Sequence, residues 1–355
     1  MNAPMSAAHQ VRTADLDDAG EIARIREFAE QQGASVFQLP SWVSAVEAGT
    51  GQRAAGLVAE QLGVITGWLP LTQVRSTLFG NALVSSGFGV GGGLCTTSAQ
   101  ATQALTRAAQ DLVLQGGFAS LELRGGPTPH GRGWQSWDNK HCSFERALAA
   151  DDEAELLAIP RKARAEVRKG LKAGLTVHMG RSNQDLRAHY AVYSESLRNL
   201  GTPVFPAKLF RAMLEAFPKD SDILTVCQDG KPLASVLSFY HGGAVLPFWG
   251  GGTFAARSAR ANELMYYELM RHARRRGAQR FDFGRSKTDS GPYKFKKNWG
   301  FEPQKLTYTQ WSKPGQTPRN IDPTSPSYAR KIAIWKKIPL PIANRLGPFV
   351  ARNLA

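Results

Sequence analysis

The chain has 355 residues, enough for two domains of ordinary size, and 42% of them are hydrophobic, which excludes wholesale disorder. Lys and Arg number 44 against 29 Asp and Glu, and the resulting formal charge of +15 favours an anionic partner. The three cysteines form no CxxC pair, and no apolar run reaches the length of a membrane-spanning helix. We therefore expect a cytoplasmic, soluble protein without a bound metal.

The first half of the chain predicts a mixed α/β unit. Helical spacing of apolar residues predicts helices over 17–31, 41–48 and 98–115. Apolar runs within 57–71 turn near Gly63 and predict a hairpin, and a strand is expected over 118–123. The run Gly87–Gly93 satisfies GxGxxG, but the acidic residue expected about twenty positions further on is missing, which favours a turn over a dinucleotide site.

The second half repeats this order. Hairpin-like runs over 224–249 precede three glycines, a helix over 262–276 and a strand over 279–283. The same offset of 160 positions relates three pairs of residues, Gly91 and Gly251, Gly117 and Gly277, and Glu122 and Asp282. A constant offset across four elements indicates an internal duplication, so the expected fold class is α/β (α+β) with one unit present twice.

A basic helix is expected between the two halves. Arg161, Arg164, Arg168 and Lys172 recur at steps of three and four, which places them in one stripe on a helix over 161–172. Like charges this close repel one another, so a bound anion would relieve the repulsion. A solvated helix face is the alternative.

The stretch Phe281–Phe301 carries the strongest functional signal. It begins as a strand, breaks at Gly284, and then alternates aromatic and cationic residues from Tyr293 onward. If that part is extended, Tyr293, Phe295 and Lys297 share one face. Cations set among packed rings suit an anionic ligand or a developing oxyanion, whereas the alternative is an edge strand with solvated lysines.

The last part of the chain changes in composition. Residues 312–326 are rich in Pro, Ser and Thr and predict a linker. Apolar residues at helical spacing within 328–340, beside four cations, predict a basic amphipathic helix, and 342–354 is similar. Such a tail can dock on its own domain, which we favour, or lie on an anionic membrane.

These segments together resemble one family. The duplicated halves, the basic helix, the turn Arg198–Pro203, the motif Phe281–Ser286 and the run Tyr293–Phe301 resemble the FemAB-like proteins of exosortase/PEP-CTERM gene neighbourhoods. Those proteins belong to the Fem family of peptidoglycan aminoacyl transferases and to the GNAT-fold superfamily. The resemblance implies two GNAT-like domains, over 1–150 and 151–311, and a basic helical tail over 312–355.

The resemblance also implies a reaction. An amine of a cell-envelope or exopolysaccharide precursor attacks an acyl ester or thioester in a cleft between the domains, and Lys296 stabilises the oxyanion. Asp282 is the first candidate for a base, ahead of Asp289, Glu263 and His241. The residues expected to bind an anionic small-molecule or lipid-linked saccharide or peptide precursor are Arg164, Arg168, Lys172, Arg285, Tyr293, Lys294, Lys297, Asn298 and Trp299.

The acyl donor is not fixed by these residues. Acetyl-CoA-using GNAT enzymes carry Gln/Arg-x-x-Gly-x-Gly/Ala before the helix that binds the diphosphate, whereas this chain has Arg260 and Asn262 where small residues should stand. Coenzyme A is therefore disfavoured, and an aminoacyl-tRNA or another acyl thioester remains open. No cofactor is expected to be bound permanently, and the tail is expected to reach the inner face of the cytoplasmic membrane if it does not dock.

Two other classes of protein compete with this interpretation. The alternation of rings and lysines over 293–299 could stack bases in a nucleic-acid-binding protein without catalysis. A degenerate acyltransferase could serve as a scaffold at a membrane surface.

Overall fold

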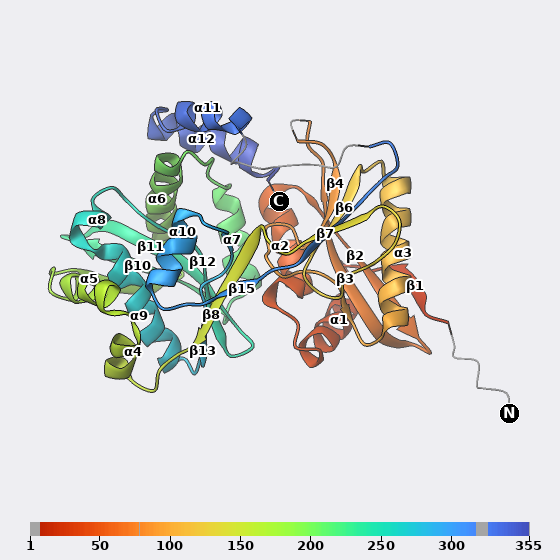
Figure 1. Ribbon diagram of the computed structural model, residues 1–355, viewed down its shortest axis with the longest axis horizontal. Coiled ribbons are helices and arrows are strands. Elements are labelled where there is room, and N and C mark those ends of the chain that lie inside the picture. The colour runs from red at the N-terminus through yellow and green to blue at the C-terminus, as the bar shows by residue number, and fades with distance from the viewer. Residues whose placement is uncertain (1–7, 78, 317–325, 355) are drawn as a thin grey trace. The chain divides into compact units, whose positions relative to one another are not determined.

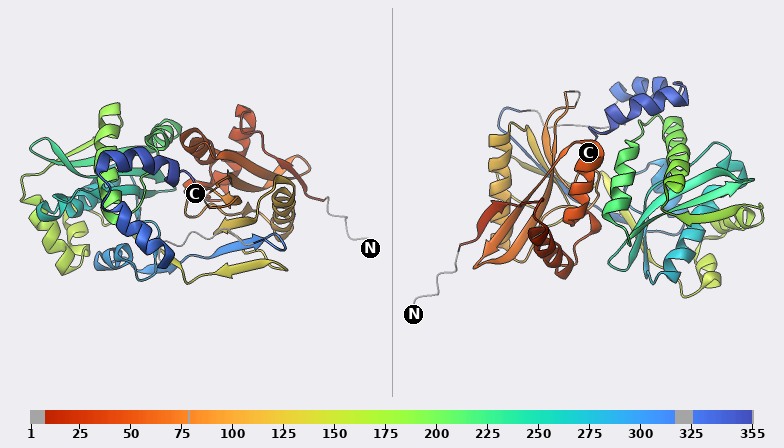
Figure 2. Two further views of the ribbon diagram at one scale, coloured as in Figure 1. Left: turned by 90° about the horizontal axis from the view of Figure 1, so that it is seen from above. Right: turned by 180° about the vertical axis from the view of Figure 1, so that it is seen from behind.

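The computed structural model describes residues 8–77, 79–316 and 326–354 and divides into two compact units. The first unit takes its described residues from Met1–Asp138, Thr307–Ile321 and Arg352–Ala355, and the second from Asn139–Leu306 and Asp322–Ala351. Figures 1 and 2 show that each unit combines a sheet with helices on its faces. The predicted α/β class with two similar units is confirmed.

Unit 1 is built on an eight-stranded sheet with the order β1-β2-β3-β4-β6-β16-β7, and β5 pairs with β3. Its strands are β1 (Gln10–Thr13), β2 (Arg53–Gln61), β3 (Val64–Val74), β4 (Ala82–Ser85), β5 (Cys95–Thr96), β6 (Ser120–Arg124), β7 (Trp134–Trp137) and β16 (Tyr308–Ser312). Its helices are α1 (Ala19–Gln31), the short 3-10 helix η1 (Val36–Gln38), α2 (Pro40–Thr50) and α3 (Ala99–Gly116). The buried face of α3 packs on one side of the sheet, and Trp68 on the other side donates a hydrogen bond from its ring to the carbonyl of Gln38 in η1 at 2.7 Å.

Unit 2 has a second eight-stranded sheet with the order β14-β8-β13-β12-β11-β10-β9, and β15 pairs with β8. Its strands are β8 (His141–Ala147), β9 (Thr176–Gly180), β10 (Ser221–Gln228), β11 (Lys231–His241), β12 (Ala244–Gly252), β13 (Arg280–Asp282), β14 (Ser286–Lys287) and β15 (Pro303–Lys305). Its helices are α4 (Asp152–Ala158), α5 (Arg161–Leu171), α6 (Asn183–Leu200), α7 (Ala207–Ala216), α8 (Ala256–Ala259), α9 (Ala261–Arg275), α10 (Gly291–Asn298), α11 (Pro326–Trp335) and α12 (Leu340–Ala351).

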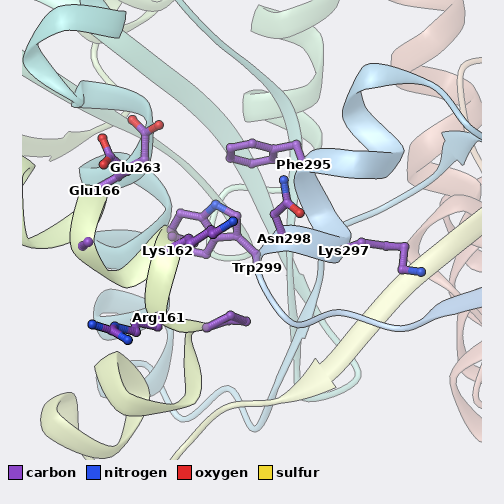
Figure 3. Close-up of a pocket in the computed structure, with 11 residues that line it drawn as sticks. Arg161, Lys162, Glu166, Glu263, Phe295, Lys297, Asn298 and Trp299 are labelled. Carbon is purple, nitrogen blue, oxygen red and sulfur yellow. The ribbon is translucent and has the colours of Figure 1, made fainter.

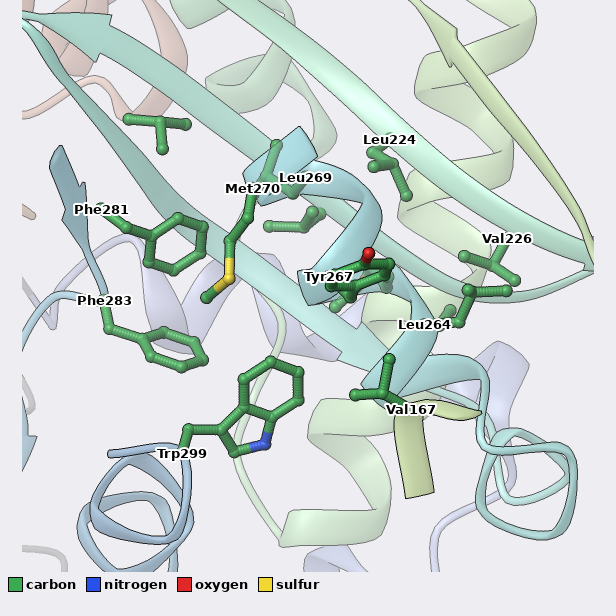
Figure 4. Packing of buried hydrophobic residues seen from close by; sticks show 14 of the residues in the cluster. Val167, Leu224, Val226, Leu264, Tyr267, Leu269, Met270, Phe281, Phe283 and Trp299 are labelled. Carbon is green, nitrogen blue, oxygen red and sulfur yellow. The ribbon is translucent and has the colours of Figure 1, made fainter. Parts of the chain in front are cut away.

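The core of unit 2 lies between its sheet and α9. Apolar side chains of α9 such as Leu264, Leu269 and Met270 meet Phe281 and Phe283 from the strand region and Trp299 beyond α10 (Figure 4). Burial of each large side chain stabilises the folded unit by roughly 1.5–3 kcal/mol. The core therefore fixes the end of β13 and the end of α10 against the same helix.

Each sheet contains one strand from the other half of the chain. β8 lies within the range predicted for the first domain but pairs with β13 in unit 2, and β16 lies in the range predicted for the second domain but pairs with β6 in unit 1. The contiguous ranges 1–150 and 151–311 differ from the observed units for this reason. Most of the predicted linker 312–326 lies outside the described residues.

Candidate functional site

The site that the sequence indicated lies where two parallel strands of unit 2 separate. β12 and β13 pair in parallel through Ala244 with Arg280 and Val245 with Phe281. β13 ends at Asp282, whereas β12 continues to Gly252. The amide of Phe283 donates to the carbonyl of Phe144 at 2.7 Å, so the chain beyond β13 stays with β8. The carboxyl end of β13 thus diverges from β12.

The segment after this divergence is a helix, and the predicted extended run from Tyr293 is wrong. α10 begins at Gly291, and the side chain of Ser290 accepts a hydrogen bond from the amide of Tyr293 at 3.3 Å. A serine cap followed by a proline in the first turn is a helix start, and this local signal prevails over the alternation of rings and lysines. Tyr293 and Phe295 therefore do not share a strand face with Lys297.

The helix buries Lys296. Only 7% of Lys296 is exposed, and its Nζ donates to the carbonyl oxygens of Gly284 at 3.0 Å and Arg285 at 3.1 Å. The same Nζ lies 5.3 Å from the ring centroid of Phe144 and 5.5 Å from that of Phe283. Burial lowers the pKa of Lys296 to about 7, and the charge of Arg285 acts in the same direction while that of Asp282 opposes it. Both protonation states of the amine are therefore populated near neutral pH.

Asp282 lies at the end of β13 beside this amine. Its carboxylate accepts a hydrogen bond from the amide of Gly284 at 2.8 Å. Burial raises the pKa of Asp282 and the nearby Glu145 raises it further, whereas the Gly284 amide, Lys296 and Arg280 lower it. The structure thus brings together the two residues that the sequence proposed as catalytic.

Of the remaining predicted cations, Arg285 adjoins this pair through its charge and its carbonyl oxygen. Arg164 donates to the carbonyl of Leu157 at 3.1 Å, and Arg168 and Lys172 lie exposed on or just beyond α5. Lys294 is exposed on α10, and Arg285 is exposed in the loop before β14. The stripe lies on the helix α5, and the contacts given for Lys296 within the described residues do not include its side chains.

Tyr293 has a packing role. Its ring meets that of Phe144 edge-on, with the centroids 5.3 Å apart. Phe144 is fully buried and also faces Lys296. Tyr293 therefore supports the wall around the amine, and the binding role predicted for it stays a prediction.

A cavity of about 830 Å³ lies beside α10 in unit 2 (Figure 3). Three predicted binding residues line it, namely Lys297, Asn298 and Trp299. The other lining residues come from α5 and the segment before it, from α9 and from α10, and they are Pro160, Arg161, Lys162, Ala163, Ala165, Glu166, Glu263 and Phe295. Lys296 does not line it, so α10 presents its neighbours to the cavity and Lys296 to the core.

The amino end of α9 places carboxylates at this cavity. Glu166 on α5 pairs with Lys169 at 2.7 Å and with Arg260, the residue before α9. Burial raises the pKa of Glu263, and the charge of Glu166 adds to the rise, although the Glu263 amide and Arg260 lower it. Two carboxylates, Glu166 and Glu263, thus lie with the cation Arg260 at the amino end of α9.

The two weaker candidates for a base lie elsewhere. Asp289 is exposed in a turn with a φ of 60°, and His241 ends β11 at the hairpin to β12. In the described ranges, no group of three or more His, Cys, Asp and Glu side chains is arranged to hold a metal ion. The part of the chain that the structure describes also contains no helix with the length and apolarity needed to cross a membrane.

Sequence reasoning missed several residues of the site. Phe144 reaches the amine from β8, and the carbonyl oxygens of Gly284 and Arg285 carry no side-chain signal. Lys162 lines the cavity from α5, beside Arg161, the first residue of the predicted stripe. The break at Gly284, which the sequence did show, is the nearest signal for the two carbonyls.

The comparisons with known proteins concern the domain family and the fold. A family model described as Acetyltransferase (GNAT) domain matches residues 160–297, and a comparison with curated proteins gives no match. Among solved structures, the chain is similar to FemX with a TM-score of 0.65 at 15% identity, over 81% of this chain and 95% of FemX. It is also similar to L-PGS from Bacillus licheniformis, with a TM-score of 0.55 at 13% identity over 95% of this chain and 96% of that one.

A further similar structure is a tandem GNAT protein from the clavulanic acid biosynthesis pathway, with a TM-score of 0.55 at 13% identity, over 86% of this chain and 100% of the other. At these identities the likeness concerns the fold. The two units are GNAT-like domains in tandem, followed by a basic helical tail.

Proposed function

We propose that this chain is an acyltransferase that moves an acyl or aminoacyl group onto an amine of a cell-envelope or exopolysaccharide precursor. The observation that carries the proposal is Lys296, a buried amine with a pKa of about 7 at the point where β13 leaves β12. Lys296 donates to two loop carbonyls, which a methionine of similar length would leave without this donor. Its position in the unit that matches the GNAT domain supports an enzymatic role.

The chemistry follows from the protons of this amine. When the acceptor amine attacks the acyl carbon, a C–N bond forms and the carbonyl oxygen becomes an oxyanion. Protonated Lys296 has three N–H groups, and within the described residues two of them donate to the carbonyls of Gly284 and Arg285. The third can donate to the oxyanion, whose charge raises the proton affinity of the amine.

The intermediate then collapses with loss of the leaving group. The C–O bond of an ester or the C–S bond of a thioester breaks, the acceptor nitrogen loses a proton, and the leaving oxygen or sulfur gains one. Asp282 is placed to take the proton because burial raises its pKa toward that of a useful base. Glu263 on α9, which lines the cavity, is the second candidate for the base.

The charged residues at the amino end of α9 restrict which acyl donor we propose. Because Glu263 and Glu166 lie there, we infer a donor that is not held through a diphosphate at that position, such as an aminoacyl-tRNA. One similar structure is described as the C-terminal domain of a putative lysylphosphatidylglycerol synthetase from Agrobacterium fabrum, with a TM-score of 0.57 at 12% identity over 82% of this chain and 92% of that one. That name describes transfer of an amino acid to a membrane component and supports an envelope acceptor here.

The link to exosortase/PEP-CTERM systems rests on the sequence resemblance. We therefore test the proposal in cells, by comparing the extracellular polysaccharide and the peptidoglycan with and without the gene. Mass spectrometry should find an N-acyl or aminoacyl group missing from the deletion strain and restored by the wild-type gene.

The decisive variant is Lys296→Met, which keeps the length and removes the charge. It should fold, as judged by circular dichroism, and reduce the modification by about 100- to 1,000-fold, as expected for loss of one oxyanion donor. Lys231→Met, at the exposed start of β11, is the matched control and should restore the modification fully. Full restoration by folded Lys296→Met would remove Lys296 from the mechanism, and an unchanged envelope in the deletion strain would refute the acceptor class.

A further inference from the structure

The tail packs on unit 2 through one face only. The buried residues of α12 are Ala343, Gly347 and Ala351, which recur every four positions along the helix. A Cβ atom added at Gly347 would lie 2.9 Å from the backbone nitrogen of Val204, so this glycine permits a close approach to the segment after α6. The prediction that the tail docks on its own domain is consistent with these contacts.

The first tail helix is anchored in a similar way. A Cβ atom at Gly201 would lie 2.5 Å from the side chain of Ile332, and Arg198 at the end of α6 donates to the carbonyl of Lys336 at 3.5 Å. Figures 1 and 2 show α11 and α12 beside α6. Docking thus uses the face of α11 that carries Ile332.

The opposite face of the tail exposes large apolar side chains. Ile342, Leu346 and Phe349 recur at steps of four and three along α12 and are 51%, 46% and 62% exposed. Ile334 on α11 is 64% exposed. We call these four side chains the outer apolar face.

Cations surround the outer apolar face. Arg330 and Lys331 stand four and three positions before Ile334 on α11, and Lys337 follows in the turn after that helix. Arg345 lies between Ile342 and Leu346 on α12. The sequence contains no Asp or Glu after Asp322. The surface therefore combines exposed aliphatic and aromatic groups with positive charge alone.

We propose that the outer apolar face of α11 and α12 binds the surface of an anionic membrane. The four apolar side chains enter the boundary between headgroups and acyl chains, and the surrounding cations meet lipid phosphates. A nucleic acid would complement the charge but not the aliphatic groups, and a second copy of this basic surface would repel it. The inference goes beyond the proposed function because it uses no residue of the transfer site.

The test uses the full chain and vesicles of phosphatidylglycerol mixed with phosphatidylcholine, separated by flotation. Wild type should float with these vesicles and not with phosphatidylcholine alone, and high salt should weaken the binding. Charge removal by R330Q/K337Q/R345Q should weaken binding by about 100-fold, from roughly fivefold per cation at a membrane surface.

Two sets of apolar substitutions test whether vesicle binding depends on the outer apolar face or on exposed apolar side chains in general. I334S/I342S/L346S/F349S should lower vesicle binding at least tenfold while keeping the circular dichroism spectrum. The matched control L62S/V64S/L114S/L157S removes four exposed apolar side chains elsewhere and should bind as wild type does. Equal binding by the two quadruple variants, or no binding by wild type, overturns the proposal.

Two further measurements separate the remaining occupants of this surface. Sedimentation equilibrium that finds a dimer abolished by the outer-face variant would assign the surface to a second copy, and tight RNA binding that competes with vesicles would assign it to a nucleic acid. Either result refutes the membrane proposal. Lys296→Met should bind vesicles as wild type does, so failure of the proposed function and failure of this inference are distinguishable.

Discussion

The two units contain the same parallel strand pair, placed at equivalent positions. In unit 1, β4 and β6 pair through Ala82 with Ser120 and Leu83 with Leu121, and in unit 2 β12 and β13 pair through Ala244 with Arg280 and Val245 with Phe281. The helices before β6 and β13 are both followed by a glycine at positive φ, Gly117 at 71° and Gly277 at 87°. The offset of 160 positions thus relates β6 to β13 and Gly117 to Gly277 in the structure, whereas the paired residues Ala82 and Ala244 are 162 positions apart.

In both units a third strand pairs with the second strand of the parallel pair. β16 pairs with β6 and places Gln310 opposite Glu122, and β8 pairs with β13 and places Glu145 opposite Asp282. Both neighbours come from the other half of the chain. Each half therefore supplies one strand that the other half needs.

The units differ at the end of the pair. In unit 1 the amide of Arg124 donates to the Ser85 hydroxyl at 2.8 Å, and the carbonyl of Arg124 accepts from the amide of Gly93 at 2.8 Å. The guanidinium of Arg124 donates to Glu122 at 2.7 Å and to the carbonyl of Gly89 at 3.0 Å. The glycine-rich loop thus joins β4 to β6 where β12 and β13 separate.

The pKa values of the charged groups at the ends of the two strand pairs also differ. Although burial lowers the pKa of Arg124, the charge of Glu122 and its hydrogen bond raise it above its ordinary value, so the guanidinium of Arg124 stays protonated. In unit 2 the carboxylate of Asp282 stands beside an amine whose pKa is about 7. The comparison assigns a structural role to the carboxylate of unit 1 and leaves unit 2 with a group that can exchange a proton near neutral pH.

The largest expected effect tests the structural role in unit 1. Arg124→Met removes a buried guanidinium from the half-buried carboxylate of Glu122 and from the Gly89 carbonyl, and should lower the free energy of unfolding by about 3 kcal/mol. Arg280→Met in unit 2 breaks the ion pair with Glu145. The side chain of Arg280 is 46% exposed, so this change should lower the free energy of unfolding by less than about 1 kcal/mol. Urea denaturation measures both, and equal losses would contradict the comparison.

The next effect concerns pH and unit 2. The unfolded chain holds a proton on Lys296 up to its ordinary pKa of 10.5, whereas the folded chain releases it near pH 7. Between these values the unfolded state binds more protons, so stability rises with pH, by at most about 1.4 kcal/mol per pH unit. Lys296→Met should abolish this rise, and the gain should be lost in wild type as the pH falls toward 7.

The control for the pH profile is Lys231→Met. An exposed amine is solvated alike in folded and unfolded chains, so this variant should run parallel to wild type from pH 7 to 10. A parallel profile for Lys296→Met as well would mean that the buried amine does not titrate in this range.

The sequence predicted those features that local patterns determine. The hairpins, α3, α9 and the duplication follow from apolar period, glycine position and spacing, and each is present. The stripe on α5 was predicted correctly as a helical face, yet of its four cations Arg161 lines the cavity, together with Lys162 from outside the stripe. Spacing defines which residues share a face, but tertiary packing decides what that face meets.

The features that the sequence did not predict depend on distant segments. Phe144 comes from β8, which joins the second sheet only because the halves exchange strands. The burial of Lys296 depends on that ring and on two loop carbonyls. In α10 a local signal was present at Ser290 and Pro292 but was outweighed by the alternation that follows.

A smaller effect examines the charges around Lys296. The negative charge of Asp282 raises the pKa of this amine and the positive charge of Arg285 lowers it. Asp282→Asn should therefore move the pKa of Lys296 down, and Arg285→Gln should move it up. A titration of the lysine ¹³Cε resonance by NMR measures both, and shifts in the same direction would contradict the assigned charges.

The smallest effect concerns the helix that holds the amine in place. Ser290→Ala removes the cap of α10 and should lower the free energy of unfolding by about 1 kcal/mol. Ser98→Ala removes the corresponding cap of α3 in unit 1, where the hydroxyl accepts from the amide of Ala101 at 3.1 Å, and should cost a similar amount. The two should differ in the titration of Lys296, because only α10 sets the amine against the carbonyls of Gly284 and Arg285. A change in that titration with Ser290→Ala and none with Ser98→Ala would show that the start of α10, rather than general stability, maintains the proton-exchanging group of unit 2.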